Sequence, residues 1–389
     1  MSGEHAPLAP SSAHIWAPDN GCRGSVALQA AYPGPPDSPD TLEGDAAHWY
    51  VAEVLNGRSP ALGTVSPNGV PINAEMIDAA QGIVTDIRDT LKACTPGTPL
   101  RVEERVYAQS VHEANWGTPD AYAVDRGQRA LHIWDFKYGH RFVDAARNWQ
   151  MIDYAIAVLD SEGFSPVVAF DHALEQWNGW RVSLTIAQPR NYDPMGPIRE
   201  WHTTGEALRD TYLARLRQSA YEAMQPGAPY TTGEHCRDCT GRHVCPALQR
   251  AAAIAMDVSL TAQPVNLPPH AVGLELRQID DAMARLDARK TGLEEHALGL
   301  IRGGTRIPFF SAQHASGRER WTVPVGEVFA LGDMLGVPVR KPPEAITPAQ
   351  ARKAGIDAGV IQAYAETPKG ALRLVRVDDD AAQLAFGGE

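Results

Sequence analysis

The chain has 389 residues, 44% of them hydrophobic, and carries 35 Lys and Arg against 47 Asp and Glu, a formal net charge of −12. This length predicts two or three modules. No apolar run is long enough to span a bilayer, and the N-terminus lacks a basic stretch followed by an apolar segment, so we expect a cytoplasmic protein with no membrane partner. The acidic balance excludes a protein whose whole surface coats nucleic acid, but residues 101–150 hold seven basic and seven acidic side chains, which leaves room for a local groove.

Two helices are predicted before the first strands. Apolar residues recur at helical spacing over residues 41–55 and again over residues 75–93. In the first helix Gly44 and His48 lie four residues apart, and therefore on one side. A lone histidine such as His48 is more often a packed or surface residue than a ligand.

The strand signals that follow centre on a hairpin between Gly117 and Lys137. The sequence Arg-Gly-Gln-Arg at 126–129 is predicted to form its bend, after an earlier strand at 101–109. If Asp125 pairs with Ala130, the antiparallel register places Asp120 opposite Asp135, with Cβ atoms about 5 Å apart.

Lys137 lies two residues beyond Asp135, so the strand period keeps it on the same face as the two carboxylates. Such a group is suited to a hard divalent cation with a cationic helper beside it. The alternative is that Asp120 is a turn residue and Asp135 a lone polar residue in an apolar strand. An unpaired buried carboxylate costs several kcal/mol, which favours the cation site. Glu104, on the preceding strand, is interpreted as an ordinary strand charge that could serve as an outer ligand.

The middle of the chain alternates helices and strands. Helices are predicted at 144–159 and 205–224, and strands at 165–170 and 181–186. This order predicts an α/β core, a mixed sheet flanked by helices. Gln150 and Tyr154 lie four apart in the first of these helices, where each alone is more often helix surface or core than a functional residue.

Three of the five cysteines form the pattern Cys236-x2-Cys239-x5-Cys245, bracketed by His235 and His243. An odd number of cysteines makes a disulfide framework improbable. Zinc would take the three thiolates and one of the histidines. An iron–sulfur cluster would need a fourth thiolate from a distant cysteine. The spacing alone slightly favours zinc.

The C-terminal part is predicted to be a mainly helical accessory region, residues 274–389, joined by a proline-rich linker at 257–273 to a domain of residues 1–256. From Leu276 to Leu300 apolar residues follow three- and four-residue steps, and Lys290 occupies the one missed position. Docking on the core, self-association and recruitment of a partner remain open for this helix. A short strand at 306–313 and a helix at 347–363 are expected beyond it.

Taken together, these motifs resemble the RecB-like branch of the PD-(D/E)XK nucleases, which includes the nuclease domains of RecB and AddB and the CRISPR-associated RecB-like iron–sulfur exonucleases. Each motif is weak alone, but the set occurs in the family's order on the expected elements. The matching residues are Gly44 and His48 for Gly-x-x-x-His, Gly117 and Asp120 for Gly-x-x-Asp, Asp135-Phe136-Lys137 for Asp-x-Lys, and Gln150 and Tyr154 for Gln-x-x-x-Tyr.

The resemblance implies a restriction-endonuclease-like core and reverses the zinc preference. Iron–sulfur members have one cysteine before the core and three after it, which implies a [4Fe–4S] cluster on Cys22, Cys236, Cys239 and Cys245 and leaves Cys94 as a buried thiol. Residues 8–14 and 132–150, and more faintly 346–377, also resemble an uncharacterised phage and prophage family of such nucleases.

For the site, the resemblance implies that one or two Mg²⁺ or Mn²⁺ ions are held by His48, Asp120, Asp135 and the Phe136 carbonyl. Lys137 would orient the attacking water or stabilise phosphate charge, Gln150 would help position the nucleophile or the strand, and Tyr154 would pack beside the DNA backbone.

The expected function is that of a metal-dependent DNA nuclease, an exonuclease on DNA ends or single strands in phage recombination or replication, with a single-strand annealing or binding protein as a partner. The chain has no phosphate loop of a helicase motor. The alternatives are a non-catalytic DNA-end-binding subunit, and a structural or interaction protein with a zinc site.

Overall fold

The structure, a computed structural model, describes residues 6–34, 38–164, 176–191, 196–259, 267–313 and 334. The chain divides into two compact units, Met1–Ala312 and Gln313–Glu389, and all elements described below belong to the first. None of the described helices combines the length and apolarity needed to cross a membrane. The predicted strand at 165–170 and helix at 347–363 fall outside the described residues.

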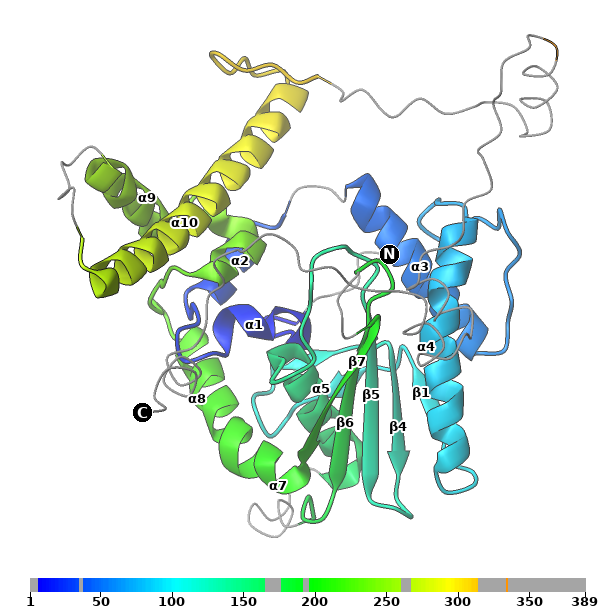
Figure 1. Cartoon of the computed structure of the whole chain (residues 1–389). Coiled ribbons are helices and arrows are strands. Elements are labelled where there is room, and N and C mark those ends of the chain that lie inside the picture. The colour runs from blue at the N-terminus through cyan, green and yellow to red at the C-terminus, as the bar shows by residue number, and fades with distance from the viewer. Residues whose placement is uncertain are drawn as a thin grey trace. The chain divides into compact units, whose positions relative to one another are not determined.

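The core of the first unit is a five-stranded mixed sheet with the strand order β1-β4-β5-β6-β7 (Figure 1). β5 and β6 are parallel, and the other neighbouring pairs are antiparallel. The prediction of a mixed sheet flanked by helices is therefore confirmed. The strands are β1 (Leu100–Val102), β4 (Ala121–Asp125), β5 (Ala130–Phe136), β6 (Arg181–Ala187) and β7 (Ile198–Thr204), and a separate ribbon pairs β2 (Val106–Tyr107) with β3 (Trp116–Gly117).

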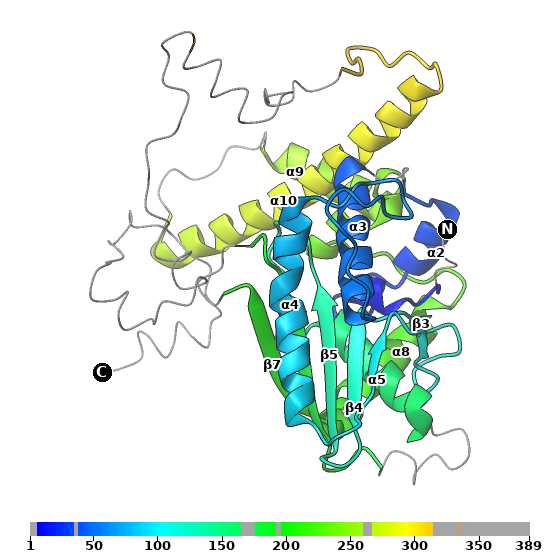
Figure 2. The ribbon, with the colours of Figure 1, turned by 90° about the vertical axis from the view of Figure 1, so that its right-hand side faces the viewer.

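Helices cover both faces of this sheet because alternate strand residues point to opposite sides. α3 (Pro39–Leu55) and α4 (Ala74–Ala93) pack side by side against one face, where they bury Trp134 and Phe136 (Figure 2). The opposite face carries Leu131 and Ile133 and is buried under α5 (Trp149–Leu159) and its neighbours.

The remaining elements are short helical segments and helices that surround the sheet or follow it in the chain. They are η1 (Pro10–Ser12), α1 (Ala13–Trp16), α2 (Ser25–Ala31), η2 (Asp160–Phe164), α7 (Gly205–Ala207), η3 (Leu208–Leu213), α8 (Ala214–Ala223), η4 (Glu234–Asp238), η5 (Thr240–His243), α9 (Pro246–Ser259) and α10 (Pro269–Arg302).

Four predicted elements differ from the structure. The strand predicted at 101–109 is broken after β1, where Glu103 adopts a positive φ of 52°. α5 begins at Trp149 rather than at residue 144, because the Asn148 side chain accepts a hydrogen bond from the Met151 amide and caps the helix there. Residues 306–313 form no strand. α9 and α10 extend into both ends of the segment that was predicted to be a linker.

Candidate functional site

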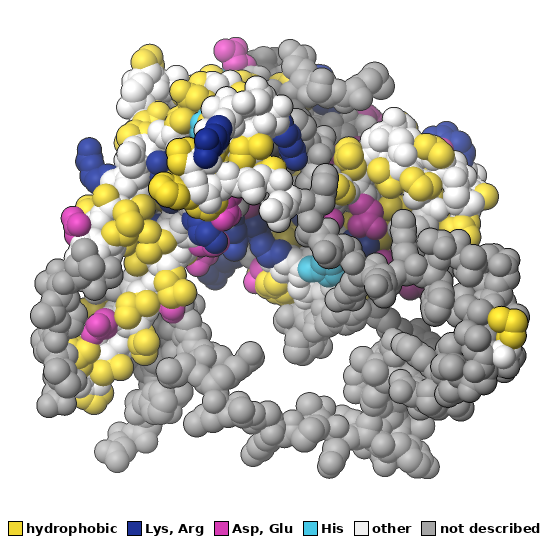
Figure 3. All heavy atoms as spheres, turned by 90° about the horizontal axis from the view of Figure 1, so that it is seen from above, with side chains coloured by type: hydrophobic (Ala, Val, Ile, Leu, Met, Phe, Trp, Pro, Cys, Tyr) yellow, Lys and Arg dark blue, Asp and Glu magenta, His cyan; other side chains and the backbone are white. Residues whose placement is uncertain are grey.

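Charged side chains gather at the end of the molecule that lies above β5 in Figure 1. Seen from this side, Lys and Arg side chains lie beside Asp and Glu side chains near the middle of the face (Figure 3). The residues singled out from the sequence lie at this end of the sheet.

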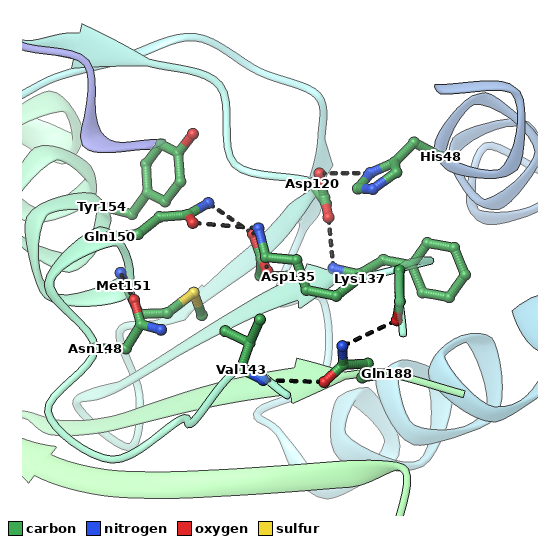
Figure 4. Close-up of polar contacts among 12 residues, drawn as sticks. His48, Asp120, Asp135, Lys137, Val143, Asn148, Gln150, Met151, Tyr154 and Gln188 are labelled. Carbon is green, nitrogen blue, oxygen red and sulfur yellow. Dashed lines mark hydrogen bonds and ion pairs between the residues drawn. The ribbon is translucent and has the colours of Figure 1, made fainter. Parts of the chain in front are cut away.

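The hairpin has the register expected from the sequence. Asp125 pairs with Ala130, and the ladder continues in step to its last pair, Ala121 and Trp134. Asp120 and Asp135 are the next residues outward and therefore stand opposite each other where the two strands open. Figure 4 shows both carboxylates in the space between α3 and α5.

Asp120 is held from two sides. One carboxylate oxygen, Oδ2, accepts a hydrogen bond from the Phe136 amide at 2.6 Å, and Oδ1 lies 3.2 Å from Nδ1 of His48. Burial alone would raise the pKa of Asp120, but the charge of His48 and the Phe136 amide hold it below its usual value. Burial lowers the pKa of His48, and Asp120 more than compensates, raising it to about 9.

Glu103 is a residue of the candidate site that the sequence did not reveal. One ligand atom each from His48, Glu103 and Asp120 lie within 4.8 Å of one another, so the three form a potential cation site. Burial of the carboxyl beside Asp120 raises the pKa of Glu103 to about 7. Glu104, the carboxylate considered from the sequence, instead faces Arg101 at 3.5 Å.

The register of β1 explains why Glu103 reaches the site. Val102 pairs with Ala121, so Glu103 is the next residue outward and stands opposite Asp120, whose carbonyl accepts its amide at 3.1 Å. The sequence did not show that β1 pairs with β4, and without this pairing Glu103 could not be placed near Asp120.

Asp135 forms a second polar group with Lys137 and Gln150. The Lys137 ammonium lies 3.0 and 3.1 Å from the two carboxylate oxygens, and the Gln150 amide donates to Oδ1 at 2.8 Å (Figure 4). Gln150 also accepts from Lys137 at 3.2 Å, which fixes the lysine. Oδ2 of Asp135 is buried, and its contact is the ion pair with the Lys137 ammonium.

The electrostatics of this group follow from its burial. Burial raises the pKa of Asp135 in spite of Lys137. For Lys137, burial opposes the charged form, but the Asp135 carboxylate outweighs it and raises the pKa, so the ammonium stays charged. Asp135 lies outside the group of three ligand atoms around Asp120, and its place among the metal ligands stays a prediction.

Tyr154 and Phe136 both make contacts that position Asp120, and the expected roles of the Phe136 carbonyl at a metal and of Tyr154 beside DNA stay predictions. The Tyr154 ring is buried, and its hydroxyl donates to the Thr118 carbonyl at 3.1 Å, so it braces the loop before Asp120. A Cβ on Gly117 would lie 3.0 Å from this ring and 2.9 Å from Pro10, which explains the glycine of that motif. Phe136 contributes its amide to Asp120 and its ring edge to His48.

The loop that follows Lys137 is held by hydrogen bonds to Gln188, directly after β6, and to Arg199 of β7. The Gln188 amide donates to the Gly139 carbonyl at 3.0 Å, and its oxygen accepts from the Val143 amide at 3.1 Å (Figure 4). The buried Arg199 donates both to this Gln188 oxygen and to the Val143 carbonyl. The loop beside the lysine is therefore preorganised.

Four of the five cysteines converge, as the resemblance implied. Cys22, Cys236, Cys239 and Cys245 are buried free thiols around one small pocket, while Cys94 is remote, beside Asp125. The Gly233 amide donates a hydrogen bond to the Cys236 sulfur at 3.4 Å, and the Ser25 amide donates to the Cys22 carbonyl at 3.2 Å.

The two nearby histidines have other partners. Nε2 of His235 contacts the Thr231 carbonyl at 3.3 Å, and the His243 ring stacks on His296 with centroids 4.9 Å apart. Among the described residues, no three cysteine sulfurs lie within 4.8 Å of one another.

The cysteine cluster is tied to the hairpin site through Asp238, which lies between two of the cysteines in sequence. Arg141, four residues after Lys137, donates two hydrogen bonds to its carboxylate at 2.7 and 3.0 Å. His14 contacts the same carboxylate at 3.1 Å. These partners hold the pKa of Asp238 far below its usual value, although burial opposes them.

Comparison with protein-family models gives a match over residues 5–328, which include the sheet, the hairpin site, all five cysteines and α10. The chain therefore belongs to the family described as protein of unknown function, DUF2800.

Proposed function

We propose that the protein is a cytoplasmic, metal-dependent DNA nuclease of the PD-(D/E)XK class that hydrolyses phosphodiester bonds. The observation that carries this proposal is the convergence of Asp120, Asp135 and Lys137 at the open end of one hairpin, with His48 and Gln150 directed at them from two helices. The residue types, their spacing and their order along the chain match the RecB-like nuclease motifs described above.

The donor set fits a hard divalent cation. His48, Glu103 and Asp120 offer one nitrogen and two carboxylates within 4.8 Å, and the buried Asp135 carboxylate, paired with Lys137, stands opposite Asp120. Mg²⁺ or Mn²⁺ bound by these residues would polarise the scissile phosphate and lower the pKa of a coordinated water.

The other residues of the site have roles that follow from their contacts. Lys137 stays charged and can stabilise the negative charge that develops on the phosphate. Gln150 holds both Lys137 and Asp135 in place. A Cβ at Gly44 would meet nothing within 4 Å, so the α3 surface one turn before His48 leaves space for a substrate strand. Tyr154 acts at a distance by bracing the loop that ends at Asp120.

For the cysteines, we propose a [4Fe–4S] cluster, with zinc as the alternative. Cys22, Cys236, Cys239 and Cys245 line one small pocket and together offer the four thiolates that such a cluster needs. The cluster would link Cys22, before the sheet, to three cysteines after it, and so stabilise the fold as a long-loop crosslink does.

A cleavage assay on end-labelled single- and double-stranded DNA tests the proposal. We expect cleavage with Mg²⁺ or Mn²⁺ that EDTA abolishes, and a loss of at least about a hundredfold in Asp135→Asn. Asp144→Asn, which changes an exposed carboxylate in the neighbouring loop, is the matched control. Undiminished cleavage by Asp135→Asn would refute the site. Binding of DNA by the wild type in Ca²⁺, together with no cleavage in Mg²⁺ or Mn²⁺, would indicate a non-catalytic end-binding subunit.

A further inference from the structure

Among the described elements, α10 packs against α9, η4 and η5, and it also carries an apolar stripe that is largely exposed. Around its middle, Ala288 and Gly292 are buried against the cysteine cluster and η5. A Cβ on Gly292 would lie 2.6 Å from the Arg242 side chain, so the glycine permits this close approach. Arg242 also forms an ion pair with Glu295 of the helix.

The apolar heptad stripe of α10 lies on the other side. With about 3.6 residues per turn, Ile279 and Ala297 are each about two and a half turns from Ala288, and so point away from the docked face. Ile279 and Met283 are 46% and 62% exposed, whereas Leu286 and Leu300 are partly buried. The α10 stripe comprises Leu276, Ile279, Met283, Leu286, Lys290, Leu293, Ala297 and Leu300.

A repeat of this kind is suited to another helix. Alternating three- and four-residue steps keep an apolar seam facing one partner helix over several turns. α10 contacts α9 as well as η4 and η5. Leu276, Ile279, Met283 and Leu293 of the seam nevertheless stay at least 43% exposed, so contacts among the described residues leave much of it open to solvent.

The two flanks of the α10 stripe differ in charge and in accessibility. On one flank Asp280, Asp287 and Glu294 recur every seven residues, and all three side chains are exposed. On the other flank Arg289 donates to the His243 carbonyl and His296 stacks on the His243 ring, so these residues already face the cysteine cluster. A helix lying on the stripe would meet an acidic border.

We propose that the α10 stripe binds an amphipathic helix of a partner protein that carries basic residues beside its own apolar seam. A second copy of the chain fits poorly. In an antiparallel pair the acidic flanks would face each other, with Asp280 opposite Glu294 and Asp287 opposite itself. A parallel pair would need the flank that Arg289 and His296 have committed to η5. Like charges placed directly opposite one another across a helix pair destabilise it.

Two synthetic helices serve as probes, each with about four heptads of Leu at the seam positions. One carries Lys at the flanking positions and the other Glu. By fluorescence anisotropy, the full-length chain is expected to bind the Lys peptide at least about tenfold more tightly than the Glu peptide.

Charge reversal of the acidic flank tests most directly whether these side chains determine which peptide binds. The triple variant Asp280→Lys, Asp287→Lys and Glu294→Lys should invert the preference between the two peptides, and Met283→Glu should weaken binding of both. A control with the same change in net charge reverses exposed acids elsewhere, at Asp89, Glu104 and Glu113, and should keep the wild-type preference.

Binding of neither peptide, or of both equally, would overturn the proposal. A wild-type dimer in sedimentation analysis that Met283→Glu dissociates would also overturn it and assign the stripe to a second copy. Because the charge-reversal variant changes only exposed residues, it keeps the test valid if Met283→Glu unfolds. The outcome does not depend on nuclease activity.

Discussion

Metal binding at the hairpin site should compete with a proton on His48. Asp120 lies 3.2 Å from Nδ1 of His48 and raises its pKa to about 9, so the imidazole is protonated at neutral pH. A metal ligand must be the neutral ring, so binding releases this proton. Below about pH 9, each unit decrease in pH should therefore weaken Mg²⁺ binding about tenfold through His48. Glu103, with a pKa of about 7, adds about a factor of two, so the affinity should fall about 100-fold between pH 9 and pH 7.

Isothermal titration calorimetry with Mg²⁺ measures both the affinity and the number of protons released. Titrations in two buffers with different ionisation enthalpies should give about one and a half protons per ion at pH 7, one from His48 and about half from Glu103. His48→Asn should flatten the dependence on pH, whereas His202→Asn, which changes an exposed histidine outside the site, should preserve it. Equal affinity at pH 7 and pH 9 in the wild type, with no proton release, would refute the reasoning.

Three further predictions follow from single side chains. Glu103→Gln should weaken Mg²⁺ binding by about tenfold or more in the same titration, and unchanged affinity would remove Glu103 from the site. Cys22→Ser should abolish the visible absorbance of protein purified without oxygen and lower its melting temperature, whereas Cys94→Ser should keep the colour. Burial raises the pKa of Asp153 from 3.8 to about 8, so the folded state keeps a proton that the unfolded chain loses. The free energy of unfolding should then fall by about 4 kcal/mol between pH 4 and pH 7 through this group, and Asp153→Asn should flatten that decrease in denaturant titrations.

The hairpin could be predicted because a strand has a short and fixed period. Once the bend was placed at 126–129, the register and the shared face of Asp120, Asp135 and Lys137 followed. Glu103 could not be found in the same way, since its position depends on the pairing of β1 with β4, which are separated in the chain by the β2–β3 ribbon.

The sequence also predicted that α10 is a helix but not which face of it docks. The heptad pattern draws attention to the apolar stripe, whereas the docked face is built on Ala288 and Gly292, whose small side chains give no hydrophobic signal. For Tyr154, too, the sequence does not show how the side chain is packed. Its spacing from Gln150 places it near the site, but only packing shows that its ring is buried.

The most direct test of the central claim uses DNA with a phosphorothioate of one stereochemistry at the cleaved position. If a divalent cation held at this site contacts the scissile phosphate, one stereoisomer should be cleaved slowly in Mg²⁺, and the more thiophilic Mn²⁺ should restore its cleavage. Cleavage of both stereoisomers that is equally fast in the two metals, or the absence of any cleavage by the wild type, would contradict the account.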